Sequence, residues 1–488
     1  MTRRGRFRWW IVALLFLFAL VNGLDRQVLS VLAPTLQAKL GFSPAQYSYA
    51  VSAFLAAYTL GYFFSGHLID RWGVKLALAL ALAFWSLAAG AHALVNGWIG
   101  LAVCRFALGL GESFNLPGGM KALSEWTPRS ERALSTAIFS NGNVIGAILA
   151  PIIVSYLALH FGWRWSFLGV ALLGVILLGL WLKNYASPAT HPKLSAEERD
   201  FLAASNAQAG APRARTSGSA RKPWGLPLHK PTDEVGLDNA VETESGVALL
   251  FSPLCVAFIL SRFLTDPMSY FLNFWIPDYL GRGRGFSLAM LGLVGWLPYL
   301  AGDIGGPGGG ALSDWLVRRG WPASRARLRL MLVAACLMPL ACCVTFARTD
   351  GLALAILALL FAAQTCWMGN QLALISESFP PHQTGRVIAW SSIGGGIGGM
   401  INSLWVGAVL KHHSYTLVFA AMGALPALAY VILIFAPYWP RWLGTRRSLG
   451  RFAPGRVPCA RRPSGSRDKR GAGQAPKGGL NWHAASRP

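Results

Sequence analysis

Long apolar segments recur along this chain, and short polar connections separate them. A helix needs about 20 apolar residues to cross the hydrocarbon core of a bilayer, and these segments meet or approach that length. The pattern therefore predicts an all-α integral membrane protein with twelve transmembrane helices. The predicted spans lie at residues 9–32, 47–69, 76–95, 97–123, 134–159, 163–182, 249–280, 288–312, 328–346, 352–376, 387–410 and 415–436.

A long polar segment divides the twelve spans into two sets of six. Gly, Pro, Ser and Arg dominate much of this linker and the end of the chain, so we expect the linker to be partly disordered and the tail disordered. The predicted units are a basic N-terminus at 1–8, six-helix bundles at 9–183 and 249–437, a cytoplasmic linker at 184–248 and a basic C-terminal tail at 438–488.

The two sets share a short motif at the end of their second span. Gly66 and Asp70, followed by Arg71, recur as Gly310 and Asp314. Glycine allows helices to approach closely, and the aspartate can cap a helix end or pair with a basic residue, so we assign these five residues to conformational change. A six-plus-six repeat with a polar linker is typical of secondary transporters.

The composition fits this membrane plan. The 488 residues are 54% hydrophobic and 13% charged, about half the charged share of a soluble protein. The net charge is +24, and the basic residues gather before the first span and after the second, fourth and eighth. The positive-inside rule then predicts an inner (cytoplasmic) membrane protein with both termini cytoplasmic.

The same charge does not indicate a nucleic-acid partner. Topology and attraction to anionic lipid headgroups account for the basic residues, and the tail contains no folded reader module. The seven cysteines show neither a metal-ligand nor a disulfide spacing. We therefore expect the lipid bilayer as the surroundings, a monomer, and no metal, cofactor or nucleic acid.

Two predicted spans of the first set each contain two charged residues that we take as candidates for the site. Asp25 and Arg26 are in the first, and Arg105 and Glu112 share one helix face in the fourth. Charges at membrane depth face the interior of the bundle or a water-filled cavity and find partners there. We predict that Arg26 binds a substrate carboxylate, with an ion pair to Asp25 as the alternative.

We assign proton coupling to Asp25, Arg105 and Glu112. Burial favours the protonated form of a carboxyl group and a nearby arginine favours the ionised form, which suits a group that changes protonation during a cycle. Glu112 is the favoured carrier and Asp25 the second candidate. The alternative for Glu112 is a static pair with Arg105, which is also a possible partner of Asp25.

Polar side chains in other spans are candidates for contact with substrate hydroxyls. Tyr58 and Asn143 belong to the first set, although packing or a bond between helices would explain either. Arg262 and Asp266 are four residues apart and are expected to pair, and with Asp303 they favour a structural network. Amides and an aromatic platform in the second set come from Gln364, Trp367, Asn370, Gln371 and Asn402.

At this point the sequence resembles a known family. The segment from Gly66 to Lys75 is similar to the loop signature of the major facilitator superfamily. The segment from Asn22 to Arg26, with Arg105 to Glu112 and Pro117, resembles its anion:cation symporter branch. Similarity to the hexuronate transporters is carried by Phe263–Pro267, Phe274–Leu280, Asp303–Gly310 and Gly320-Trp321. The resemblance implies two bundles of six helices, alternating access and proton-coupled uptake of sugar acids.

Two positions depart from the branch pattern. The branch often has an aromatic residue where this chain has Gly23, and a glutamine where this chain has Asn143. Both changes alter the shape or hydrogen bonding of the expected pocket and leave the particular sugar acid open.

We predict a proton-driven symporter of a small organic anion, favouring a hexuronate such as galacturonate or glucuronate. Alternatives are another organic anion, such as an aldonate, an aldarate or an aromatic acid, and a membrane receptor that does not transport its ligand. An enzyme is not expected, because the close functional groups are charges of opposite sign rather than a nucleophile with a base.

Overall fold

The computed structural model of the chain describes residues 7–194, 197–199, 201–202, 249–412 and 414–436. Most of the predicted linker and all of the predicted tail lie outside the described residues. The chain that the structure describes is helical throughout, apart from short connections.

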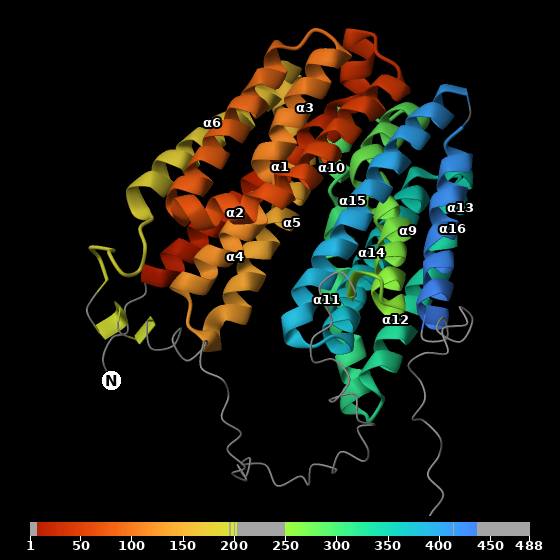
Figure 1. The fold of residues 1–488 in the computed structure, drawn as a ribbon. Helices are drawn as coiled ribbons and strands as arrows, with labels where there is room; N and C mark the ends of the chain where they lie inside the picture. Colours follow the sequence, from red (N-terminus) through yellow and green to blue (C-terminus); the bar gives the residue numbers. More distant parts are fainter. Residues whose placement is uncertain (1–6, 195–196, 200, 203–248, 413, 437–488) are drawn as a thin grey trace, which may run out of the picture. The chain divides into compact units, whose positions relative to one another are not determined.

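The first half contains six long or medium helices, drawn in red to yellow in Figure 1. A 3₁₀ turn at His92–Leu94 follows α2. Inside α2, Gly73 has φ 77° and ψ 158°, a conformation that favours glycine, so two helices meet there without a longer loop. The elements are α1 (Phe7–Leu40), α2 (Pro44–Ala91), α3 (Trp98–Glu112), α4 (Asn115–Trp126), α5 (Arg129–His160) and α6 (Trp163–Asn184).

The second half, green to blue in Figure 1, divides two of its spans into shorter pieces. A π-helical turn at Tyr279–Gly283 and a 3₁₀ turn at Met338–Leu340 lie between helices. The elements are α9 (Pro253–Asp278), α10 (Leu288–Val294), α11 (Leu297–Arg318), α12 (Ala323–Leu337), α13 (Ala341–Phe346), α14 (Asp350–Ser378), α15 (Pro381–His412) and α16 (Tyr415–Phe435).

The number of spans follows from these helices. Ten segments of the described chain are long and apolar enough to cross a membrane. One of them, Pro44–Leu94, holds two helices that meet at Gly73. The helix α9 adds a further span, because its 26 residues suffice to cross although it carries Arg262 and Asp266. The predicted twelve helices in two sets of six are thereby confirmed.

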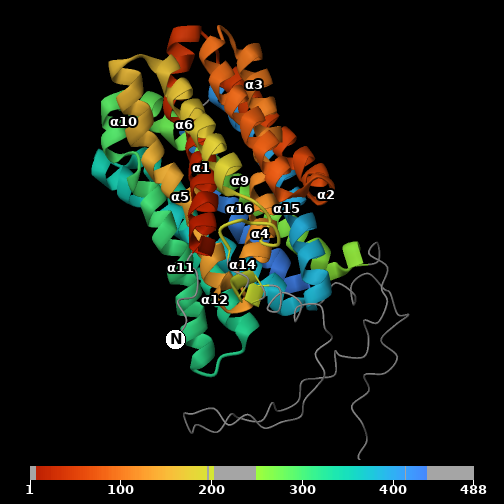
Figure 2. The same cartoon turned by 90° about the vertical axis from the view of Figure 1, so that its left-hand side faces the viewer.

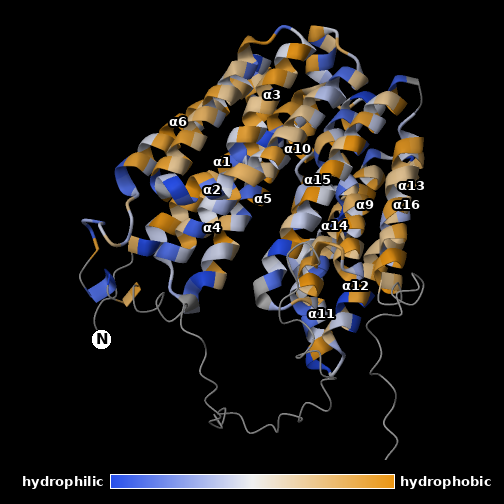
Figure 3. Cartoon of the chain, in the orientation of Figure 1, coloured by the Kyte–Doolittle hydropathy of each residue, from blue (hydrophilic) through white to orange (hydrophobic). Residues whose placement is uncertain are grey.

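The outward faces of the helices are apolar. On α6, Leu172, Val175 and Ile176 are exposed although all three are strongly hydrophobic. Figure 3 shows such hydrophobic stretches along the helices, with hydrophilic residues mainly near their ends. Surfaces of this kind face lipid rather than water, as expected for a multi-pass membrane protein.

Glycine brings α1 and α5 together, and the two helices lie side by side in Figure 2. A Cβ atom at Gly142 would lie 2.3 Å from the carbonyl oxygen of Phe16, and one at Gly146 would lie 2.2 Å from that of Leu20. No other residue fits at these positions without moving a backbone, so the pair of glycines fixes the distance between the helices.

The two halves meet at one end of the helices. Tyr47 donates a hydrogen bond to the carbonyl oxygen of Phe274, and Gln37 donates one to Asp278 at 2.8 Å. Among the described residues, the hydrogen bonds and ring contacts between the halves all involve residues 27–54 of the first half. We call the end where α1 ends and α2 begins the contact end.

The repeated motif lies at the opposite end. Asp70 forms an ion pair with Lys121 of α4 at 2.6 Å. Asp314 pairs at 2.7 Å with Arg327, which also pairs with Glu377 of α14. Both aspartates therefore hold helix ends together within their own half. The motif glycines make no close helix contact in this conformation, because a Cβ atom at Gly66 or Gly310 would meet no atom within 4 Å. Their assignment to conformational change stays a prediction. Arg71 is exposed.

Candidate functional site

A buried ion pair joins α1 to α3. The Nε atom of Arg26 donates a hydrogen bond to Oε2 of Glu112 at 2.8 Å. The Glu112 side chain is fully buried, whereas 22% of the Arg26 side chain is exposed. Arg26 also leaves its Nη2 atom without a hydrogen-bond partner among the described residues. Arg26 therefore neutralises Glu112 and keeps one buried donor, Nη2, without a partner among the described residues.

The structure forms neither of the two alternative pairings. Among the described residues, Arg26 pairs with Glu112, and no ion pair joins Arg26 to Asp25 or Glu112 to Arg105. Seven residues of α-helix advance by about 10 Å, so Arg105 and Glu112 share a face but stand too far apart along it to bond directly. The partner of Glu112 comes instead from another helix, because the Arg26 side chain reaches across from α1.

Arg105 and Asp25 are buried close to this pair. Arg105 is 1% exposed, its guanidinium carbon lies 5.8 Å from the centre of the Phe54 ring, and its Nε and Nη2 atoms have no partner among the described residues. Asp25 is 3% exposed, and its Oδ2 atom also lacks a partner there. Unsatisfied charged atoms at depth are costly and point to a site whose bonds change during function.

Tyr58 covers the ion pair from α2. Its ring lies 4.4 Å from the guanidinium carbon of Arg26, within the range of a cation–π contact. Its hydroxyl group shares a 2.8 Å hydrogen bond with Tyr62. The same side chain lines a cavity of about 150 Å³ between α1, α2, α4 and α5. Tyr58 thus touches both the cation and an open space.

Asn143 lines the same cavity from α5. Its amide donates a hydrogen bond to Oδ1 of Asn22 at 3.3 Å. Asn22 and Asn115 also line the cavity, and the sequence did not single out either as a site residue. Asn22 stands one helical turn before Arg26, and this spacing was the signal that its amide shares a face with the arginine.

The two departures from the branch pattern are neighbours in space. A Cβ atom at Gly23 would lie 2.2 Å from the carbonyl oxygen of Asn143 and 3.0 Å from its side-chain oxygen. An aromatic side chain at position 23 therefore does not fit beside α5 as it stands here. Gly23 lies against Asn143, which lines the cavity, so the two departures are one structural change rather than two.

The candidate residues of the second half lie inside their own bundle. Gln364 donates to the carbonyl oxygen of Thr265, and Asn402 donates to that of Pro267. Trp367 is fully buried and donates to Gln371, and Asn370 is fully buried as well. The described structure therefore shows these side chains holding α14 and α15 against α9, without an exposed platform for a sugar ring.

The expected pair of Arg262 and Asp266 forms on α9, at 2.8 Å. Arg262 also donates to Ser392 of α15 at 3.3 Å. A Cβ atom at Gly395 would lie only 1.8 Å from Oδ2 of Asp266, so the glycine makes room for the carboxylate. Asp303 is half-buried on α11 and makes no hydrogen bond or ion pair with another described residue. Arg262 and Asp266 thus form a network between α9 and α15, as the sequence favoured, but Asp303 takes no part in it in this structure.

Helices with apolar outer faces, arranged in two sets around buried charges, define a multi-pass membrane transporter. The family model of the Major Facilitator Superfamily matches residues 15–401. The chain belongs to this superfamily, and the resemblance inferred from its motifs is confirmed. Its relatives are transporters, not enzymes.

Two curated relatives and one solved structure illustrate the similarity. The chain is 32% identical over 304 residues to the galacturonate transporter of Dickeya chrysanthemi, covering 61% of this chain and 79% of that protein. It is 29% identical over 428 residues to the hexuronate transporter of Escherichia coli (strain K12), covering 87% and 93%. The xylose transporter XylE from E. coli, in an inward open conformation, shares the fold with a TM-score of 0.62 at 15% identity, covering 88% of this chain and 96% of that one.

Proposed function

We propose that the protein couples the entry of protons to the uptake of a monovalent sugar acid, a hexuronate such as galacturonate or glucuronate. It works as a monomer in the inner membrane with both termini in the cytoplasm. The similarity to a galacturonate and a hexuronate transporter supports the substrate class. The basic residues at alternate connections support the orientation.

One observation carries this proposal: the partly exposed Arg26 is bonded to the fully buried Glu112 and keeps one donor without a partner among the described residues. Its Nε atom is bonded to Glu112, and its Nη2 atom is unoccupied by any described residue. A guanidinium binds carboxylates through two parallel bonds, so a sugar acid can take the free donor and compete for the bonded one. Substrate binding then weakens the hold of Arg26 on Glu112.

This competition couples the substrate to a proton. A carboxylate at membrane depth that loses its cation is costly, and a proton taken up by that carboxylate removes the cost. Glu112 therefore carries the proton when the substrate occupies Arg26 and releases it when the substrate leaves. Asp25 and Arg105 lie nearby and set the charge balance of the group, which titrates as a coupled set.

The polar wall of the 150 Å³ cavity suits the rest of the ligand. Amides of Asn22, Asn115 and Asn143 and the hydroxyl of Tyr58 are donors and acceptors of the kind that bind sugar hydroxyls. We base the site on the first half, because the donors of Gln364 and Asn402 are already bonded to α9.

Counterflow in proteoliposomes tests the transport function and its specificity. Vesicles loaded with unlabelled galacturonate are diluted into labelled galacturonate, glucuronate, an aldonate, an aldarate or an aromatic acid. We expect the labelled hexuronates to enter fastest and to accumulate when the interior is made alkaline. Fastest exchange of another acid would assign that acid, and binding without exchange of any would favour a receptor.

A further inference from the structure

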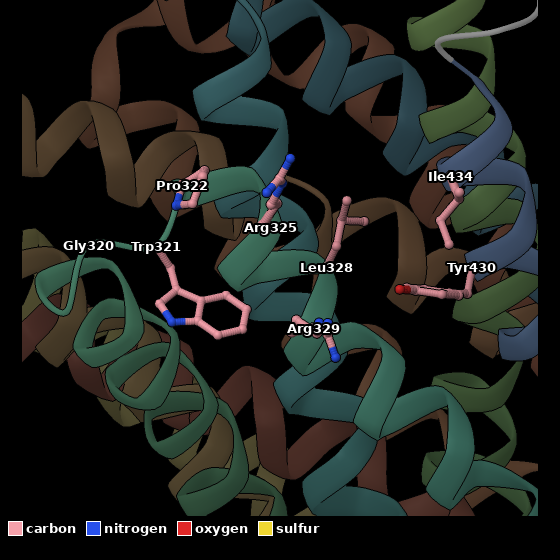
Figure 4. A pocket seen from close by; sticks show the side chains of 8 residues that line it. All are labelled: Gly320, Trp321, Pro322, Arg325, Leu328, Arg329, Tyr430 and Ile434. Carbon is pink, nitrogen blue, oxygen red and sulfur yellow. The ribbon is translucent and has the colours of Figure 1, made fainter. Parts of the chain in front are cut away.

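A second cavity, of about 550 Å³, lies far from the charged pair, in the second half. It is formed where α11 ends, α12 begins and α16 ends, opposite the contact end. Two arginines, Arg325 and Arg329, and two aromatic residues, Trp321 and Tyr430, line it together with Leu328 and Ile434. Figure 4 shows Trp321 and Tyr430 on opposite sides, with Leu328 and the arginines between them.

The two arginines of this cavity have no acidic partner among the described residues. They stand four residues apart on α12 and so share one face of the helix. Between them in sequence, Arg327 points elsewhere and pairs with Asp314 and Glu377. On α12, Arg327 is thus neutralised within the protein, whereas Arg325 and Arg329 face the cavity without an acidic partner among the described residues. Arg329 lies 5.7 Å from the centre of the Trp321 ring, which helps to hold its guanidinium in place.

We propose that this cavity binds the headgroup of an anionic phospholipid. Guanidinium groups match the geometry of a phosphate, and Trp and Tyr are typical of the boundary between membrane and water. Leu328 and the exposed Ile434 provide an apolar side for the start of the acyl chains. Basic pockets between transmembrane helices bind acidic headgroups elsewhere by the same chemistry.

The composition of the C-terminal tail argues against the tail as a competing occupant of the cavity. The residues after Phe435 are rich in arginine and contain a single aspartate, Asp468. The charge of these residues does not complement an arginine-lined cavity. A soluble organic anion has no apolar part that would contact Leu328 and Ile434, whereas the acyl chains of a lipid would. A lipid therefore fits the cavity better.

Native mass spectrometry of the purified full chain tests the proposal, with phosphatidylglycerol and phosphatidylcholine as probes. The variant is Arg325→Gln with Arg329→Gln. The matched control is Arg318→Gln with Arg319→Gln, which removes the same charge from the same connection outside the cavity. We expect phosphatidylglycerol to bind the variant about 25-fold more weakly and the control normally, since each of the two arginines near a membrane surface contributes about fivefold. Phosphatidylcholine should bind all three proteins equally.

Three results would overturn the proposal. Equal loss of phosphatidylglycerol in variant and control would mean unspecific attraction to charge, and undiminished binding in the variant would mean another site. Glycerol phosphate that displaces phosphatidylglycerol at equal concentration would assign a soluble anion instead. A thermal-melting series checks folding, because phosphatidylglycerol should raise the melting temperature of the native protein and of the control but not of the variant.

Discussion

Arg26 meets two requirements with one side chain. Through Nε it neutralises Glu112, which has no exposed surface, and its buried Nη2 atom is left without a partner among the described residues as a donor for a substrate carboxylate. Lysine keeps the charge but offers a single compact ammonium group, without the planar fork or the stacking on Tyr58. A lysine at position 26 would therefore test the role of geometry separately from the role of charge.

We predict that Arg26→Lys lowers kcat/KM for hexuronate uptake at least tenfold, because the bidentate geometry is lost while the charge remains. Uptake of labelled galacturonate into proteoliposomes measures the effect. Arg164→Lys is the control, since Arg164 also stacks on an aromatic ring, Trp163, but away from the buried charges. Affinity close to normal in Arg26→Lys would make Arg26 a structural charge.

A second substitution at the same pair separates coupling from binding. Glu112→Gln imitates the protonated carboxyl group, so we predict that it binds ligand and exchanges it at equilibrium but does not accumulate it against a gradient. The reason is linkage, because a group couples two ligands only if its own state changes between the steps. Counterflow and proton-driven uptake in the same vesicles measure the two activities.

The outcome distinguishes three roles for Glu112. A purely structural pair predicts that folding, binding and exchange all decline, because Arg26 is left as a buried cation without its partner. Accumulation retained by Glu112→Gln would move the proton to Asp25, whose Oδ2 atom has no partner among the described residues. Asp25→Asn in the same assay is then the direct comparison.

Sequence identified the charged residues but not their pairing. Arg26, Arg105, Glu112 and Asp25 stand out because charges are rare in apolar spans, which is a property of the sequence alone. Which of them bond depends on how the helices of the first half are rotated about their axes, and that rotation is set by packing. The cavity amide Asn115 was missed for the same reason, because one polar residue near a helix start has no distinguishing pattern.

At the scale of elements, glycines on α15 set how closely the two halves approach. Gly407 lies against the start of α2, where a Cβ atom would stand 2.4 Å from Cβ of Ser48 and 3.0 Å from the carbonyl oxygen of Pro44. These are atoms that no rotamer change can move. The contact is between halves, so it exists only while the contact end is closed.

We predict that Gly407→Ala favours conformations in which the contact end is open. The measurement is the distance between spin labels at Leu94 and Phe346, which are 79% and 72% exposed at that end, one in each half. The distance distribution should shift to larger values and uptake should slow. Gly385→Ala is the control on the same helix, since a Cβ atom there meets nothing within 4 Å. An unchanged distance distribution would mean that α2 shifts locally to make room for the added Cβ atom while the contact end stays closed.

The positions of the membrane-spanning helices were predictable from the length of the apolar segments. The breaks within these helices were not. The apolar pattern located all twelve spans, because length and apolarity decide whether a segment crosses a bilayer. The division of the eighth span into α10 and α11, and the turn at Gly73 with no loop of its own, arise from local backbone geometry. Charged α9 was found as a span by its length and flanks, although its composition is less apolar.

At the scale of the whole molecule, two independent features mark the same end of the helices. The ion pairs of Arg8 with Glu131 and of Asp70 with Lys121 join helix ends opposite the contact end. The basic residues that follow the second, fourth and eighth spans belong to this end as well. If the positive-inside rule holds, the described conformation is closed toward the outside and separates its halves toward the cytoplasm.

The orientation can be tested in the full chain with inserted tags. We predict that tags in the linker, between residues 206 and 230, and after Arg441 are reached only from the cytoplasm, because arginine-rich connections resist translocation. A tag between Ala347 and Asp350, at the contact end, should be reached from outside. Membrane-impermeant labelling of intact cells and of inverted vesicles compares the two sides. A linker tag labelled in intact cells would reverse the orientation, and the described conformation would then be the one open to the outside.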